Sequence, residues 1–179
     1  EGEMGSENDM ELFKRIHAGS EIDYLTIHIW PKNWSWIKAD SIAQTLESAI
    51  MKTDGYIANH ALVARQLNKP LVIEEFGLPR DQHKFSLDAP TLNRDRYYAN
   101  IFEKVLSSAM TNGIIAGANF WAYGGLARPD KTSQFWKPGD DYMGDPGQEE
   151  QGLNSVFDAD TTMGIVKDYN LKIRSATSQ

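Results

Sequence analysis

The sequence predicts an α/β fold that forms the last portion of a (β/α)8 TIM barrel. Runs of β-branched and aromatic residues typical of strands alternate with helical patterns, and the runs recur about every 40 residues, which is the repeat of parallel βα units. Three such runs occur in the 179 residues, whereas a complete barrel has eight strands and takes about 250 residues. Residues 1–179 are therefore expected to form the C-terminal portion of one barrel domain, with the first half of the barrel absent from this chain.

The first part of the chain predicts two helices around one strand. A helix is expected over about 7–18, where apolar residues recur at helical spacing after the capping box that begins at Ser6. A mostly buried strand is expected over 22–30, which is rich in β-branched and aromatic residues and stops at a proline. A second helix is expected over 41–67, and Asp54-Gly55 is the point at which it would break into two.

A second strand and a third helix and strand follow. The apolar run 71–75 after a proline predicts the strand. Asn93 is expected to cap the helix, which stops at Asn112-Gly113. The third strand is expected over about 114–121.

The remainder predicts a long loop and a last helix. The loop runs from Gly124 to about Asp158 without a regular pattern, and loops of this length inside a compact domain are usually functional or disordered. Its Phe135 and Trp136 argue against disorder. Asp160 is then expected to cap a helix near 161–173.

The composition argues against several kinds of partner. The chain has 18 basic and 25 acidic residues and a net charge of −7, with no basic cluster dense enough to follow a phosphate backbone, so nucleic acid is not expected. No stretch approaches the roughly 18 consecutive apolar residues of a membrane span. Cysteine is absent, and the histidines and aspartates lack the spacing of metal ligands, so neither a metal site nor a cofactor is expected.

The ends of the three predicted strands carry the candidate chemistry, because reactive side chains in such barrels stand at the C-terminal ends of strands. The ends are His28-Ile29-Trp30, Glu74-Glu75-Phe76-Gly77 and Asn119-Phe120-Trp121. They would bring a carboxylate, an imidazole and large aromatic faces to one cavity. Glycosidic cleavage needs this set, since a carboxylate attacks or stabilises an oxocarbenium-like carbon while aromatic faces hold sugar rings.

Each of these residues also has a structural interpretation. A glutamate at a strand end is often a solvated ion-pair partner, and a single histidine such as His28 is more often a core residue. Strand alternation lets only one of Glu74 and Glu75 face the barrel axis, and the other is expected to pair with the surrounding helices. The spacing alone does not choose between the two.

With these residues assembled, the chain resembles the C-terminal part of the β-mannanases (mannan endo-1,4-β-mannosidases) of glycoside hydrolase family 5, over nearly its whole length. Many related glycosidases share a Glu-Phe-Gly at a strand end, whereas the Trp-Pro-x-Asn-Trp run and the Asp-Pro…Gln-Gly loop point to mannanases. The segments that carry the resemblance are 2–6 after the fifth barrel strand, 28–34 at the sixth, 69–80 at the seventh, 94–98, 119–121 at the eighth, 144–146, 150–152 and 155–158.

The resemblance implies roles for particular residues. In this family the nucleophile directly precedes the Phe-Gly or Tyr-Gly, which selects Glu75 over Glu74. The same resemblance implies that His28 helps to fix the site around the reacting sugar and that Trp121 forms the platform beneath it. Trp34 and Trp136 are candidates for neighbouring sugar subsites, with packing as the alternative role for both.

Two departures from the family pattern matter. Where many relatives have a tyrosine near the nucleophile, this chain has Trp30, whose indole N–H donates a hydrogen bond but accepts no proton. Relatives also carry the general acid/base as the glutamate of an Asn-Glu pair, and this chain contains no such pair.

The resemblance implies endo-acting hydrolysis of β-1,4-mannosidic bonds by a retaining mechanism in an intact parent, and the chain alone is expected to be inactive. Its expected partners are mannan, glucomannan or galactomannan oligosaccharides, together with the missing N-terminal half of the barrel or a second copy of the chain. The alternatives are a related glycosidase acting on β-glucan or cellulose, and a non-catalytic carbohydrate-binding fragment. Because a polymeric substrate cannot cross a membrane, an extracellular or periplasmic location is expected.

Overall fold

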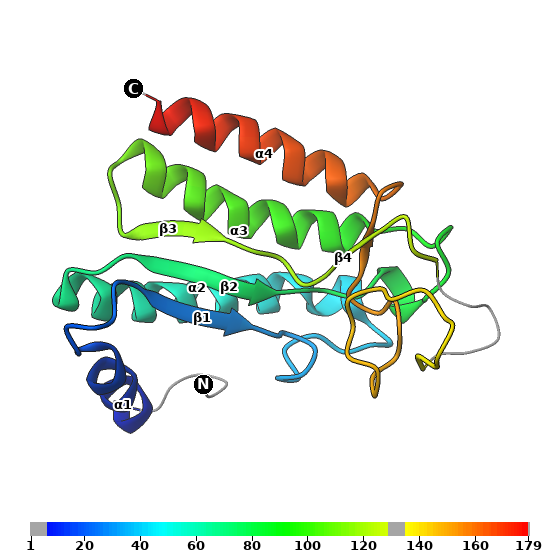
Figure 1. Cartoon of the computed structure of the whole chain (residues 1–179), viewed down its shortest axis with the longest axis horizontal. Coiled ribbons are helices and arrows are strands. Elements are labelled where there is room, and N and C mark those ends of the chain that lie inside the picture. The colour runs from blue at the N-terminus through cyan, green and yellow to red at the C-terminus, as the bar shows by residue number, and fades with distance from the viewer. Residues whose placement is uncertain (1–6, 129–134, 179) are drawn as a thin grey trace.

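The computed structural model describes residues 7–128 and 135–178, so the predicted capping residue Ser6 and the segment 2–6 lie outside the described part. Helices and strands alternate through the first two thirds of the chain (Figure 1). The elements are α1 (Glu7–His17), β1 (Leu25–Ile29), α2 (Ile42–Leu67), β2 (Leu71–Phe76), the 3-10 turn η1 (Asp81–His83), α3 (Leu92–Met110), β3 (Ile115–Ala118), β4 (Tyr123–Gly125), β5 (Val156–Phe157) and α4 (Thr161–Thr177).

The first three strands form one parallel sheet in the order β1-β2-β3, which confirms the predicted parallel βα arrangement. Within the described residues, β1 and β3 each pair with β2 alone, so both edges of the sheet are open. Helix α3 packs against both β3 and α4, and it lies between them in Figure 1. This is the arrangement of a partial barrel.

The two faces of the sheet differ in burial. Leu25, Ile27 and Ile29 of β1 are completely buried in the core formed with the helices, and Leu71 and Ile73 of β2 join them there. The residues between them in the strands point the opposite way and are partly exposed. The helix-facing side of the sheet is therefore the core, and the other side corresponds to the barrel axis.

Helix α2 is continuous for 26 residues and does not break at Asp54-Gly55. The Asp54 carboxylate accepts a hydrogen bond from Asn100 Nδ2 at 2.8 Å and from Lys104 Nζ at 2.7 Å, and both of these residues belong to α3. A glycine inside a helix costs about 1 kcal/mol relative to alanine. These contacts with α3 help to offset that cost.

One of the two predicted helix caps is wrong, although both helices form. Thr91 occupies the N-cap position of α3, and the backbone N–H and Nδ2 of Asn93 both donate to Asp81 Oδ1 in η1. Asp160 does occupy the N-cap position of α4, but its carboxylate makes no capping hydrogen bond. It accepts instead from the backbone N–H of Phe157 at 2.9 Å and from buried arginines.

The predicted loop 124–158 contains regular structure. Strands β4 and β5, about thirty residues apart in the chain, pair in parallel, and Phe135 and Glu150 form an isolated antiparallel bridge. The third strand of the main sheet is correspondingly shorter than the predicted 114–121. No helix among the described residues is both long enough and apolar enough to cross a membrane.

Candidate functional site

His28 and Glu75 lie opposite each other at the ends of β1 and β2. His28 Nδ1 is 3.3 Å from Glu75 Oε2, and the two side chains are 34% and 28% exposed. They stand on the face of the sheet that does not pack on the helices. The two strand ends therefore converge as the sequence predicted.

Glu74 lies on the same side, and the prediction that it pairs with the surrounding helices is wrong. The register of β1 against β2 shifts after Ile27, so that Ile27 pairs with Ile73 and His28 pairs with Glu75. Such a bulge adds one residue to a strand and interrupts the alternation of side chains. As a result Glu74 Oε2 is 4.0 Å from His28 Nε2, and one imidazole lies between two carboxylates.

Gly77 forms the corner where the three strand ends meet. A Cβ atom at this position would lie 2.8 Å from the backbone O of Trp121 and 2.8 Å from Cζ3 of Trp30, closer than side-chain carbons approach in folded proteins. The backbone N–H of Trp121 also donates to the Phe76 carbonyl at 2.8 Å. A glycine is required here because Trp30 and the Trp121 backbone both approach the chain directly after Glu75 and Phe76.

The other two predicted aromatic residues lie in different surroundings. The ring of Trp34 packs on Trp36 and Tyr56 at centroid distances of 4.9 and 5.2 Å, against the core. Trp136 lies in the segment between β4 and β5, 38% exposed, and its indole N–H donates to the Asp140 carbonyl at 3.2 Å. Packing thus accounts for Trp34 at least in part, and a role in sugar binding stays a prediction for both.

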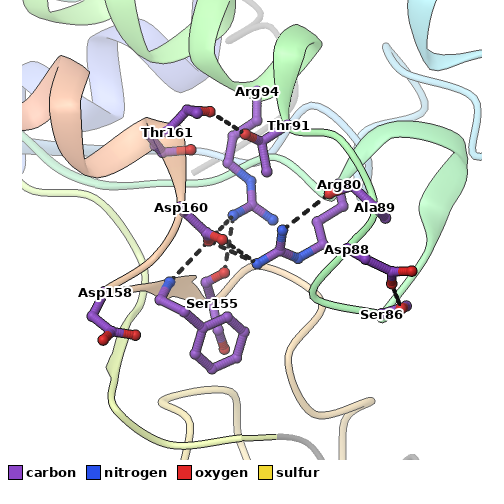
Figure 2. A network of polar contacts seen from close by, with 12 residues as sticks. Arg80, Ser86, Asp88, Ala89, Thr91, Arg94, Ser155, Asp158, Asp160 and Thr161 are labelled. Carbon is purple, nitrogen blue, oxygen red and sulfur yellow. Dashed lines mark hydrogen bonds and ion pairs between the residues drawn. The ribbon is translucent and has the colours of Figure 1, made fainter.

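A buried ionic network involves the segment that follows β2 (Figure 2). Arg80 Nη2 donates to both carboxylate oxygens of Asp160, at 2.6 and 2.8 Å, and Arg94 Nη1 lies 3.3 Å from the same carboxylate. The three side chains are at most 4% exposed. Burial lowers the pKa of Arg94 from its usual value. The network joins the segment after β2, helix α3 and the start of α4.

Asp145, in the segment between β4 and β5, has a completely buried side chain. Its Oδ2 accepts from Ser155 Oγ and from the backbone N–H of Gly152, both at 2.8 Å. Burial raises the pKa of Asp145, and these hydrogen bonds oppose the rise. The Ser155 hydroxyl is 2.7 Å from the Met143 carbonyl as well, so the carboxylate holds this segment together.

Sequence reasoning assigned no role to Arg80, Arg94 or Asp145, and it gave Asp160 only a capping role. Both arginines fall in segments that carry the family resemblance, and this was the signal in the sequence that could have pointed to them. Within residues 7–128 and 135–178, no group of three or more histidine, cysteine, aspartate or glutamate side chains is arranged to hold a metal ion.

Comparisons with known proteins show the family of the chain. A family model described as GH family 5 beta-mannosidase-like matches residues 1–178. Mannan endo-1,4-beta-mannosidase 5 of Arabidopsis thaliana is 31% identical over 110 residues, which are 61% of this chain and 23% of that protein. The putative mannan endo-1,4-beta-mannosidase 9 of Oryza sativa subsp. japonica is 30% identical over 101 residues, 56% of this chain and 22% of that protein.

Solved structures give the same assignment. The glycoside hydrolase family 5 mannosidase from Rhizomucor miehei has a TM-score of 0.86 and 35% identity, covering 97% of this chain and 43% of that chain. The endo-beta-1,4-mannanase from Thermotoga petrophila, with a TM-score of 0.54 and 20% identity, shares the fold over 90% of this chain and 28% of that chain. The chain thus spans less than half the length of these relatives. It belongs to the β-mannosidase-like proteins of glycoside hydrolase family 5 and corresponds to the C-terminal part of their (β/α)8 barrel.

Proposed function

We propose that this chain supplies the nucleophile side of the active site of a retaining glycosidase that cleaves β-1,4-mannosidic bonds within mannan-type polysaccharides. The observation that carries the proposal is the contact between Glu75 and His28 at adjacent strand ends, beside the corner formed by Trp30, Gly77 and Trp121. One related Rhizomucor miehei mannosidase structure holds mannosyl-fructose, which supports a mannose-containing ligand here.

The proposed reaction is a double displacement. A carboxylate oxygen of Glu75 attacks the anomeric carbon, and the glycosidic C–O bond breaks as the leaving oxygen takes a proton from a general acid outside this chain. The same group then removes a proton from water, which attacks the anomeric carbon and frees Glu75. Two inversions retain the configuration, and the two carboxyl groups should stand about 5–5.5 Å apart in the complete barrel.

The remaining strands of the barrel are the proposed partner of this chain. Both edge strands of the main sheet have an open side within the described residues. A cavity of about 520 Å³ lies between β3 and the two helices α3 and α4, and its lining includes Phe102, Phe120, Val166 and Ile173. Open strand edges and apolar hollows of this kind favour association, with the rest of the barrel or with a second copy of the chain. We expect negligible hydrolysis by the chain alone.

Carbohydrate binding without cleavage is the second candidate for the isolated chain, because the chain contains no Asn-Glu pair to supply the acid/base. The two candidates differ in whether a bound mannan oligosaccharide is consumed. A preference for β-glucan is a variant of the first candidate, and it differs in the orientation of one hydroxyl group on the sugar.

The intact protein tests the proposal through two variants assayed on mannan, galactomannan, glucomannan and cellulose. Glu75→Gln should lose activity by on the order of 10³-fold or more, whereas Glu74→Gln, one residue away, should keep measurable activity. Proton NMR of the first products should show the β-anomer. Full activity in Glu75→Gln, or α-anomer as the first product, would rule out the proposed mechanism, and cleavage of cellulose but not mannan would reassign the substrate.

We also propose that the parent acts outside the cytoplasm, in the extracellular or periplasmic space, since polymeric mannan does not cross a membrane. Measuring mannanase activity in the culture medium, the periplasm and the cytoplasm of the source cells tests this. Activity confined to the cytoplasm would contradict it.

A further inference from the structure

We infer that Arg94 is a positioning residue that fixes the place of Trp121 relative to Glu75. The inference rests on the proposed function, in which Glu75 is the nucleophile and Trp121 the sugar platform. The experiment that tests it measures the surroundings of Trp121 and does not depend on hydrolysis, so the inference and the proposed function can fail separately. Arg94 touches neither residue and acts through the backbone segments that carry them.

The first step is the contact of Arg94 with the segment that leaves β2. Arg94 projects from the first turn of α3 and is completely buried. Its Nε donates to the Leu78 carbonyl at 2.9 Å. Leu78 comes three residues after Glu75 and directly after Gly77, where Trp30 and Trp121 approach the chain. One edge of the guanidinium group therefore holds the turn that follows the nucleophile.

The second step is the contact with the segment before β5. Arg94 Nη1 donates to the Ser155 carbonyl at 2.9 Å, as Figure 2 shows. The neighbours of Ser155 bind both backbone polar groups of Ala122. Ala122 N–H donates to the Asn154 carbonyl at 3.3 Å, and Val156 N–H donates to the Ala122 carbonyl at 2.8 Å. Ala122 directly follows Trp121.

These contacts form a closed ring of hydrogen-bonded backbone segments. Trp121 N–H donates to the Phe76 carbonyl on one side, and Ala122 is held by 154–156 on the other. Arg94 then joins Ser155 back to Leu78, two residues beyond Phe76. Without Arg94, residues 119–121 would keep their hydrogen bonds to Ile73 and Phe76 of β2, and the segment around Ser155 would lose its direct link to the turn after β2.

The chemistry of the position favours arginine. A guanidinium group presents donors in fixed directions within one plane, so Nε and Nη1 can reach two carbonyls at once. Lysine keeps the positive charge but concentrates its donors at one point on a flexible chain. Asp160, 3.3 Å from Nη1, supplies the negative charge that a buried guanidinium group needs.

Arg80 provides a matched control. It is as buried as Arg94 and pairs with the same Asp160 carboxylate, but its other hydrogen bond goes to the Ala89 carbonyl, which lies outside the ring. Arg80→Lys and Arg94→Lys therefore make the same chemical change to the same buried network. Only the second opens the ring.

The experiment is ¹⁵N–¹H NMR of the tryptophan indole groups in the 179-residue chain, with the five signals assigned by single Trp→Phe variants. Arg94→Lys should move the signals of Trp121 and Trp30 and leave that of Trp36 in place, because Trp36 is buried against Trp34 and Tyr56 in the core. Arg80→Lys should leave the Trp121 signal where it is. Equal displacement of Trp121 by both variants, or no displacement by Arg94→Lys, would overturn the inference.

If Arg94→Lys does not fold, hydrogen exchange in the unaltered chain gives an independent answer. A closed ring requires the backbone amides of Trp121 and Val156 and the Nε–H of Arg94 to exchange together, as slowly as the buried part of α3. Fast exchange of the Trp121 and Val156 amides while Arg94 Nε–H stays protected would show that Arg94 does not hold this corner.

Discussion

Replacing Asp160 with asparagine should destabilise the fold more than a single polar substitution usually does. The carboxylate accepts two hydrogen bonds from Arg80, one from the backbone N–H of Phe157, and lies 3.3 Å from Arg94. Asparagine fills the same volume and keeps one acceptor oxygen. It leaves two buried guanidinium groups without any negative charge in this network.

The size of the loss follows from the burial of the three groups. Removing one partner of a buried ion pair costs about 3–5 kcal/mol, because a charge is left buried without compensation. Two arginines depend on Asp160, and all three side chains are at most 4% exposed, so the upper part of that range applies. A domain of this length has a free energy of unfolding of about 5–15 kcal/mol. The melting temperature should fall by roughly 10–20 °C.

Urea unfolding followed by circular dichroism measures this loss, and Asp158→Asn is the matched control. Asp158 pairs with Arg128 at 2.6 Å, but both side chains are more than a third exposed, so that change should cost only a small fraction of the Asp160→Asn loss. Adding Arg80→Met to Asp160→Asn should recover part of the stability, since it removes one unpaired charge. Equal losses for the two asparagine variants would refute the reasoning.

Two further predictions concern the site and its buried acid. Gly77→Ala should displace Trp30 or the Trp121 backbone, because the new Cβ would lie 2.8 Å from each, and should cost about 1–3 kcal/mol; an unchanged tryptophan emission spectrum and unfolding midpoint would contradict this. Burial raises the pKa of Asp145, so the folded chain binds more protons than the unfolded chain between the ordinary and the raised pKa. Stability from this group is complete below the ordinary pKa and is lost as the pH rises through the raised pKa, so Asp145→Asn should flatten the fall in stability that begins as the pH rises above the ordinary pKa. An unaltered pH profile of urea unfolding would show that burial of Asp145 is not the cause.

Long periodic segments were predictable from the sequence, and short non-local pairings were not. The helices α1, α2, α3 and α4 and the three parallel strands formed where apolar spacing placed them. Strands β4 and β5 escaped prediction because they have three and two residues and pair across about thirty positions. A pattern of side chains cannot appear over so few residues, and the pairing depends on contacts made only in the folded chain.

The candidate site was predictable as a place but not in its detail. Strand ends and apolar runs brought His28, Glu75 and Trp121 to one edge of the sheet. The position of Glu74 could not be foreseen, because a bulge between β1 and β2 overrides the alternation that the sequence implies. The same limit applies to Asp160. Its position before a helix predicted a cap and gave no sign of its ion pair with Arg80, eighty residues earlier in the chain.

Covalent labelling of the intact protein with an activated 2-deoxy-2-fluoro-mannosyl fluoride tests the central claim, that Glu75 is the nucleophile, most directly. Fluoride leaves without a proton from the general acid, and an ester forms between a Glu75 oxygen and the anomeric carbon. Mass spectrometry of peptides should place one added fluoromannosyl group on Glu75, with none on the adjacent Glu74 and none in Glu75→Gln. An adduct on Glu74, or no adduct with a protein that still cleaves mannan, would contradict the account.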